Sequence, residues 1–207
     1  MTGAEFMIDD FEFLIDCILL KLNIMAVVFE NMKMEDYPAF LNLYNNIFPH
    51  DQRRLYEDEK HLDNYIRMKG GKFNAFSAKD GDLFLGFLSY WTFEGYTYVE
   101  HFAVDPAHRN KNIGRLMLEH LFKEVSPNVL LETEPGINQE AQRRIEFYEK
   151  NGFKVRKEFN YTQPSYGGKG QVAVPMLLMT HGQVSLHNIN SIKDMLKEVY
   201  NVNHPSD

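Results

Sequence analysis

Cysteine is scarce in this sequence: Cys17 is the only one among 207 residues. A single thiol excludes an internal disulfide framework and a metal site built on two cysteines, and it is typical of a reducing compartment, so we expect a cytoplasmic protein. The histidines follow no metal-ligand spacing either, and no metal is expected. Cys17 also lies far from the motifs described below, which argues against a covalent acyl-cysteine intermediate.

Positive charge is also in short supply, because 22 Lys and Arg face 29 Asp and Glu, for a formal net charge of −7. General nucleic-acid binding needs a basic field that collects phosphates, so we do not expect a nucleic-acid partner. An acidic protein suits a cationic amine substrate better. With 44% hydrophobic residues, the chain can bury a sizeable core, and its length suits one α/β domain with an appendage.

Long apolar runs are missing from the first 24 residues. The longest uncharged apolar stretch before Lys21 is Cys17 to Leu20, far below the roughly 20 apolar residues that a membrane span requires. The segment begins with acidic residues, whereas a secretory signal begins with basic ones, so no membrane association is expected. Residues 1–24 are interpreted either as an extension upstream of Met25 or as a helical appendage docked on the core.

The most informative stretch runs from Tyr98 to Met117, where an apolar strand, a turn broken by proline and a basic loop lead into an amphipathic helix. Residues 109–114 bring backbone N–H groups to the helix N-terminus, where unpaired donors and the positive end of the dipole favour an anion. Arg109, Lys111 and Arg115 add positive charge. The stretch therefore predicts a pyrophosphate site.

The same loop, Arg109-Asn-Lys-Asn112-Ile-Gly114, resembles the acetyl-CoA loop of the GNAT-type N-acetyltransferase superfamily, whose pattern is Arg/Gln-x-x-Gly-x-Gly/Ala directly after a strand. Asn112 stands at the first glycine position, and Asn is among the few residues that tolerate a positive φ. A second segment, Arg144 to Phe153, looks like the superfamily's helix that ends in Tyr-x-x-x-Gly-Phe. The two motifs occur in the family's order.

This resemblance covers about residues 26–180 and implies an α/β (α+β) fold with a mixed, largely antiparallel central sheet, helices on both faces and splayed central strands. Apolar periodicity and turn residues predict the same order of elements. Strands are expected at residues 27–29, 73–78, 83–94, 96–104, 129–134, 153–159 and 172–179, and helices at 35–48, 51–69, 110–124 and 138–151.

Three segments are therefore expected: an extension (1–24), an N-acetyltransferase domain (25–182) and a C-terminal helical tail (183–207). Apolar residues of the tail recur at helical spacing from Ile192 to Val199. The tail helix is expected to pack on the domain or on a second subunit, so a homodimer is one of the two alternatives.

Acetyl transfer from a thioester to an amine needs a neutral amine, a polarised carbonyl and a stabilised leaving thiolate. Glu100 is the first candidate for the general base, because it interrupts an apolar strand on which the family often places a carboxylate. The alternative is a structural carboxylate paired with Lys or Arg. Glu132 and Glu134, on one face of the next strand, are reserve candidates for the base or for an amine anchor.

Tyr148 matches the family's tyrosine that lies near the CoA sulfur and protonates the leaving thiolate; the alternative is a core aromatic residue. The resemblance further implies that backbone and loop groups hold acetyl-CoA. The residues concerned are Phe102, Ala103, Val104, Arg109, Asn110, Lys111, Asn112, Ile113, Gly114 and Arg115. Asn138 is added because this chain has Ala141 where the family often has the Asn that binds pantetheine. By strand alternation, His101 is expected on the face opposite Glu100.

The sequence thus predicts an acetyl-CoA-dependent N-acetyltransferase that moves an acetyl group to the primary amine of a small molecule or peptide, by direct attack in a ternary complex. The alternative is a non-catalytic acyl-CoA-binding or interaction module on the same fold. Asn112 and Ala141 favour the module, and the presence of Glu100 and Tyr148 favours the enzyme.

Overall fold

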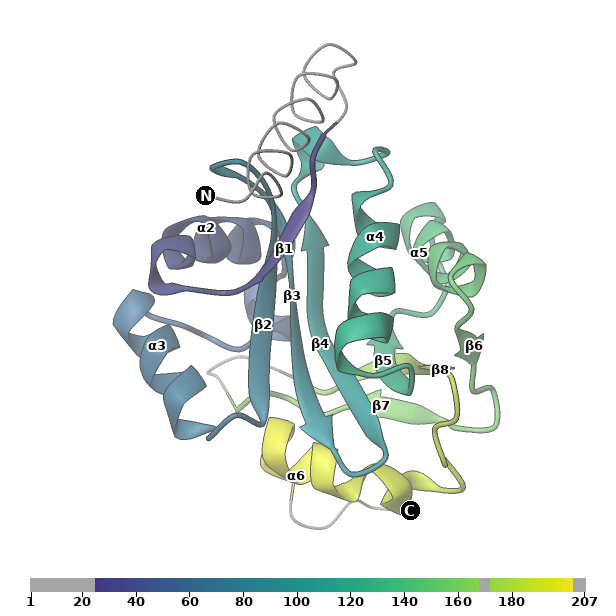
Figure 1. Cartoon of the computed structure of the whole chain (residues 1–207). Coiled ribbons are helices and arrows are strands. Elements are labelled where there is room, and N and C mark those ends of the chain that lie inside the picture. Colours follow the sequence, from purple (N-terminus) through teal and green to yellow (C-terminus); the bar gives the residue numbers. More distant parts are fainter. Residues whose placement is uncertain (1–24, 168–171, 203–207) are drawn as a thin grey trace, which may run out of the picture.

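The computed structural model describes residues 25–167 and 172–202, so the expected extension 1–24 lies outside the described residues. A mixed sheet in the order β1-β2-β3-β4-β5-β8-β6, with β7 paired to β8, forms the centre (Figure 1). The strands are β1 (Val28–Asn31), β2 (Phe73–Asp80), β3 (Leu83–Phe93), β4 (Tyr96–Val104), β5 (Val129–Thr133), β6 (Lys154–Val155), β7 (Tyr161–Gln163) and β8 (Val174–His181). Among the described residues, all strand pairs are antiparallel except β4 with β5, which confirms the predicted mixed, largely antiparallel sheet.

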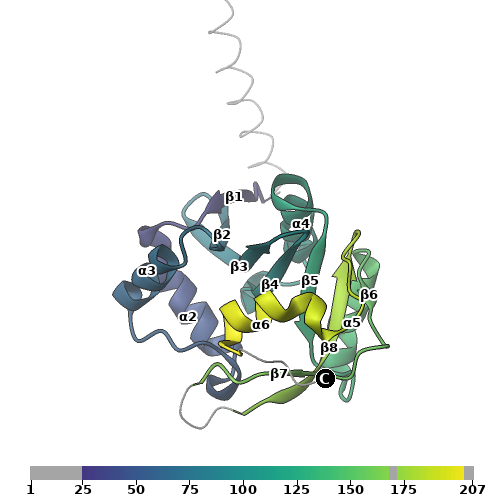
Figure 2. The same ribbon diagram turned by 90° about the horizontal axis from the view of Figure 1, so that it is seen from below.

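The helices cover both faces of this sheet, as expected. They are α2 (Tyr37–Ile47), α3 (Glu59–Met68), α4 (Ile113–His120), α5 (Gln139–Lys150) and α6 (Lys193–Tyr200). Buried side chains of α4 and α5 pack on one face, whereas those of α2, α3 and α6 pack on the other. Figure 2 shows α6 lying across the sheet between α2 and β8.

The C-terminal helix packs on its own domain. Met195, Leu196 and Val199 of α6 are buried against Trp91 of β3 and Leu130 of β5. Complete burial of an apolar side chain of this size contributes roughly 1.5–3 kcal/mol. The apolar stripe read from the sequence is therefore covered within the chain and needs no second subunit.

Several element boundaries differ from the predicted ones. The helix expected at 51–69 begins only at Glu59, because Asp58 caps it by accepting a 2.8 Å hydrogen bond from the His61 N–H. The helix expected at 110–124 is α4 followed by a π-helical turn, Leu121–Val125. The strand expected at 153–159 shrinks to β6, and β7 forms at residues 161–163, where no strand was predicted.

Strands β4 and β5 pair only at their beginnings, which confirms the expected splay. Their paired residues are Thr97 with Val129, Tyr98 with Leu130 and Val99 with Leu131. Beyond these pairs β4 continues to Val104 and β5 to Thr133. Glu100 and Glu132 are therefore the first residues after the last β4–β5 pair, one on each strand.

Candidate active site

The divergence of β4 from β5 leaves backbone donors on the free side of β4. The N–H of Asp105 donates to the carbonyl of Leu85 at 2.8 Å, so successive N–H groups on β4 alternate between β3 and the gap. This alternation directs the N–H groups of Phe102 and Val104 toward the gap and that of Ala103 toward β3. Of the three predicted backbone contacts, Phe102 and Val104 have the geometry to meet a ligand.

Two asparagines give the loop that follows β4 a left-handed turn before α4. Asn110 and Asn112 adopt left-handed conformations with φ of 64° and 60°, and Asn112 is the N-cap residue of α4. The first backbone hydrogen bond of α4 runs from the N–H of Leu116 to the carbonyl of Asn112. Within the described residues the N–H groups of residues 113–115 have no protein acceptor, so they can receive an anion.

Side chains around this loop supply charge and close packing. Lys111 is exposed, Arg109 donates to the Val104 carbonyl at 3.3 Å, and Arg115 forms a 2.6 Å ion pair with Glu119. A Cβ atom added at Gly114 would lie 3.2 Å from Cζ of Phe147, so glycine lets α4 approach α5 closely. The residues predicted to bind the pyrophosphate, 109–115, thus lie together at the N-terminal end of α4.

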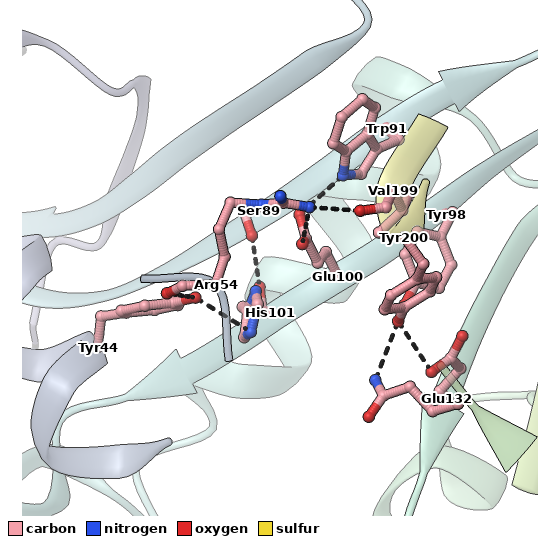
Figure 3. Close-up of polar contacts among 11 residues, drawn as sticks. Tyr44, Arg54, Ser89, Trp91, Tyr98, Glu100, His101, Glu132, Val199 and Tyr200 are labelled. Carbon is pink, nitrogen blue, oxygen red and sulfur yellow. Dashed lines mark hydrogen bonds and ion pairs between the residues drawn. The ribbon is translucent and has the colours of Figure 1, made fainter. Parts of the chain in front are cut away.

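Glu100 is held by two donors instead of facing solvent (Figure 3). Its side chain has no exposed surface; Trp91 Nε1 donates to Oε2 at 2.7 Å, and Arg54 Nη2 lies 3.3 Å from Oε1. The same Arg54 nitrogen donates to the Val199 carbonyl of α6 at 2.7 Å. This is the arrangement of the structural alternative, a strand carboxylate paired with arginine.

His101 lies on the same face as Glu100, so the expectation of opposite faces was wrong. The β3–β4 register shifts between Ser89 and Tyr90, which leaves Glu100 as an extra residue in a β-bulge. The bulge turns both side chains toward the α2 face, where the His101 Nε2 atom lies 3.4 Å from the Tyr44 hydroxyl. Burial lowers the pKa of His101 to about 4, so its imidazole is neutral at pH 7.

Glu132 is surrounded by hydroxyl groups. Tyr161 donates to Oε1 at 2.7 Å and Tyr200 to Oε2 at 3.1 Å. The Tyr200 hydroxyl in turn contacts the Tyr98 hydroxyl at 2.8 Å and the amide nitrogen of Gln163 at 2.9 Å. Burial raises the pKa of Glu132 to about 7, although the hydrogen bonds from these side chains act in the opposite direction. This half-buried carboxyl therefore titrates near neutral pH, where a general base is most effective.

Glu134 has different surroundings from Glu132, although alternation placed the two on one face. It lies just beyond β5, where Arg144 of α5 donates to its Oε2 at 2.7 Å. The period-2 pattern ends with the strand, so Glu134 turns toward α5. Its carboxylate is neutralised by Arg144, which leaves Glu132 as the better placed of the two reserve candidates.

Tyr148 of α5 lies in the core cluster that also contains the buried side chains of α4. Its ring packs on those of Phe147 and Phe153, with centroids 5.4 and 5.5 Å away. Burial raises the pKa of Tyr148 to about 12, against the opposing effect of Arg144, so the hydroxyl keeps its proton at pH 7. Among the described residues, none forms a hydrogen bond with this hydroxyl. Asn138 caps α5, and its Oδ1 accepts from the Ala141 N–H at 2.8 Å.

No group of three or more His, Cys, Asp or Glu in residues 25–167 and 172–202 could hold a metal ion. In the same residues no helix combines the length and the apolar character needed to cross a membrane.

Comparisons with known proteins agree with this geometry. The family model described as an acetyltransferase (GNAT) domain matches residues 72–155. A solved structure from Bacteroides thetaiotaomicron, assigned to the GNAT family of acetyltransferases, is 35% identical, with a TM-score of 0.74 and coverage of 84% of this chain and 99% of the other. No curated protein matches significantly.

More distant solved structures share the fold. The dodecameric spermidine N-acetyltransferase from Vibrio cholerae is 14% identical, with a TM-score of 0.56 over 78% of this chain and 96% of the other. The ribosomal-protein-S18-alanine N-acetyltransferase from Escherichia coli is 19% identical, with a TM-score of 0.53 over 78% and 99%. The 35% identical structure matches this chain over 99% of its own length. Together with the splayed strands and the loop before α4, this match shows that the chain belongs to the GNAT family of acetyltransferases.

Proposed function

We propose that the protein is an acetyl-CoA-dependent N-acetyltransferase that acetylates a primary amine and uses Glu132 as its general base. The observation that carries this proposal is a half-buried carboxyl, with a pKa raised to about 7, at the point where β4 and β5 separate. A base with a pKa near the working pH is ionised often enough to act and still strong enough to accept a proton. The acceptor is a small molecule or a peptide amine.

Acetyl-CoA as cosubstrate fits the residues along the gap. Its pyrophosphate would lie against the N–H groups of residues 113–115, with Arg109 and Lys111 adding charge. The N–H groups of Phe102 and Val104 would hold the pantetheine arm and the thioester oxygen. These contacts use the backbone, so they tolerate Asn112 in place of the glycine of the family motif.

The transfer is a direct attack. The amine nitrogen bonds to the thioester carbonyl carbon as its proton passes to Glu132, directly or through a water. The carbon–sulfur bond then breaks, and Tyr148 protonates the departing thiolate. Glu132 releases its proton to solvent and Tyr148 regains one, so both groups return to their starting states. Tyr148 can act as the proton donor because its hydroxyl is protonated at the start, with a pKa that burial raises to about 12. No covalent enzyme intermediate is needed.

Glu100 stays the alternative base. Its two oxygens accept hydrogen bonds from Trp91 and from the Arg54 guanidinium, which is its counterion. The two oxygens of Glu132 also accept hydrogen bonds, but their donors, Tyr161 and Tyr200, are neutral. Of the two carboxylates beside the gap, the surroundings favour Glu132 as the base and Glu100 as a structural anchor.

The proposal is tested by measuring thiol release from acetyl-CoA with a panel of amines between pH 5.5 and 9. We expect at least one amine to accelerate release, with an acidic limb near pH 7 that reports a single ionisation. Glu132→Gln should lower kcat by about 10²–10⁴-fold and remove that limb. Glu134→Gln is the matched control and should keep the wild-type kcat and the acidic limb. CoA binding without thiol release for any amine would instead support the non-catalytic acyl-CoA-binding module.

A further inference from the structure

The C-terminal helix α6 reaches the candidate site although it lies beyond residues 72–155, which match the family model. We propose that Tyr200, the last residue of α6, is a positioning residue that fixes the Glu132 carboxylate through its hydroxyl, so that α6 is part of the catalytic unit. This inference rests on the proposed role of Glu132. The tail is then more than the appendage expected from the sequence.

The hydrogen bonds of Tyr200 determine where its proton points. A tyrosine hydroxyl has one proton and two lone pairs. The amide nitrogen of Gln163 can only donate, and it contacts the Tyr200 oxygen at 2.9 Å. The Tyr98 hydroxyl, 2.8 Å away, can fill the second lone pair. The proton of Tyr200 is therefore directed to Glu132 Oε2, 3.1 Å away, and the ionised carboxylate is the strongest acceptor in the cluster.

The last turn of α6 is held in place from several sides. Arg54 donates to the Val199 carbonyl at 2.7 Å, and Lys72 lies 3.0 Å from Glu198. Asn201 is the C-cap residue of the helix, and its left-handed backbone, φ 60°, lets the N–H of Val202 donate to the Leu196 carbonyl at 3.1 Å. Tyr200 itself is only 5% exposed. A side chain fixed at both its backbone and its ring can hold a carboxylate in one orientation.

The groups that face Glu132 come from three elements: Tyr98 from β4, Tyr161 and Gln163 from β7, and Tyr200 from α6. The ring of Tyr166 packs 4.9 Å from that of Tyr200. The charged groups next to this cluster are those of the Arg54–Glu100 pair, and the Arg54 guanidinium lies 5.0 Å from the Tyr166 ring. Since a hydrogen bond to the carboxylate favours its ionised form, loss of the Tyr200 hydroxyl should raise the pKa of Glu132.

The direct test is a ¹³C NMR titration of the glutamate side-chain carboxyls, with the Glu132 signal assigned by its loss in Glu132→Gln. We expect Tyr200→Phe to raise the titration midpoint by about half to one pH unit, roughly a three- to tenfold change in proton affinity. Tyr96→Phe is the matched control, because the Tyr96 ring packs in the same cluster and its hydroxyl has no hydrogen-bond partner in the described structure. It should leave the midpoint unchanged.

A second variant keeps the test possible if Tyr200→Phe does not fold. Gln163→Leu removes the donor that orients the Tyr200 hydroxyl and should shift the midpoint in the same direction by a smaller amount. If both variants keep the wild-type midpoint in a folded protein, as checked by circular dichroism, the proposal is overturned. If Tyr200→Phe unfolds, an unchanged midpoint in Gln163→Leu overturns the proposal; a raised midpoint supports it only if Gln163→Glu, which keeps a hydrogen-bonding side chain of the same length, gives a smaller rise.

Kinetics separate this inference from the proposed function. If the wild type is an active enzyme, Tyr200→Phe should shift the acidic limb of its kcat–pH profile to higher pH by the same amount as the NMR midpoint. A purely structural tyrosine would lower kcat without shifting the limb. An unmoved limb overturns the positioning role. If the midpoint shifts while no amine is acetylated by the wild type, the proposed function fails and the contact between Tyr200 and Glu132 still stands.

Discussion

Arg54 Nη2 lies 3.3 Å from Glu100 Oε1, and the Glu100 side chain has no exposed surface. The Arg54 guanidinium also lies 4.5 Å from the Tyr65 ring and donates to the Val199 carbonyl. One buried ion pair thus connects the segment before α3 with β4 and α6. A buried pair adds little net stability, but removing one partner leaves an uncompensated charge.

Glu100→Gln should therefore destabilise the fold. Without the carboxylate, Arg54 keeps a charge with no counterion in its buried site, and the expected loss of unfolding free energy is about 3–5 kcal/mol. Urea denaturation at pH 7.5 measures it. The double variant Glu100→Gln, Arg54→Met should lose less than the sum of the two single variants.

The same variant discriminates between the two candidate bases. Glu100→Gln should retain the acidic limb of the pH–rate profile, because Glu132 still titrates. A stable Glu100→Gln protein that has lost this limb would return the role of base to Glu100.

Glu132 should also make stability depend on pH. Its folded-state pKa of about 7 is above the ordinary 4.5, so the folded protein binds this proton more tightly than the unfolded chain. The resulting stabilisation is fully present below about pH 4.5 and is lost as pH rises through about 7; it amounts to up to about 3 kcal/mol. The measurement is the difference in urea-derived stability between wild type and Glu132→Gln from pH 5 to 8.

The comparison with Glu132→Gln is needed because His101 acts in the opposite direction. Burial lowers its pKa from 6.5 to about 4, so its contribution is present above about pH 6.5 and is lost as pH falls toward 4. The two effects partly cancel in the wild type. A difference between the two proteins that does not change across this range would mean that Glu132 ionises normally.

The elements that depend on local sequence could be predicted. The backbone turn before α4 could be predicted because its residues are contiguous, and Asn112 adopts a positive φ, which asparagine tolerates. Gly152, with φ of 86°, follows the C-terminus of α5 as expected. The apolar stripe of α6 predicted a helix that packs on another surface. These features follow from side-chain periodicity and from backbone preferences of single residues.

The surroundings of the two carboxylates could not be predicted in the same way. The bulge at Glu100 depends on how β3 and β4 pair, which alternation along one strand does not reveal. The partners of Glu132 come from Tyr98, Tyr161, Gln163 and Tyr200, up to 68 residues away. A sequence signal did exist, since Tyr161 and Gln163 alternate as in a strand, but β7 has only three residues, too few for alternation to predict it.

Asn112 offers a test of the phosphate loop. Because its φ is 60°, Asn112→Gly should keep both stability and CoA binding, whereas Asn112→Ala should cost about 1–2 kcal/mol in the left-handed conformation. We expect a weaker thermal shift with CoA for the alanine variant only. Asn46→Ala, on the exposed face of α2, is the control. Equal CoA shifts in the alanine and glycine variants would show that the left-handed turn does not matter for binding.

The role of Tyr148 rests on its protonated hydroxyl, for which the described residues provide no hydrogen-bond partner. Tyr148→Phe should therefore leave the unfolding free energy within about 0.5 kcal/mol of wild type. It should lower kcat by about 10²–10⁴-fold with little change in the dissociation constant of CoA, because a proton donated to the thiolate acts only in the transition state. Steady-state kinetics and CoA titration measure the two quantities.

The control for Tyr148→Phe is Tyr90→Phe, another buried tyrosine of the same core cluster that lies on β3. It also removes a phenolic hydroxyl on the same side of the sheet, and it should keep the wild-type kcat. Desulfo-CoA should stabilise wild type and Tyr148→Phe nearly equally, because the pyrophosphate contacts do not involve sulfur. If Tyr148→Phe keeps full kcat, its hydroxyl takes no part in the transfer, and the ring serves only to pack α5 against Phe153.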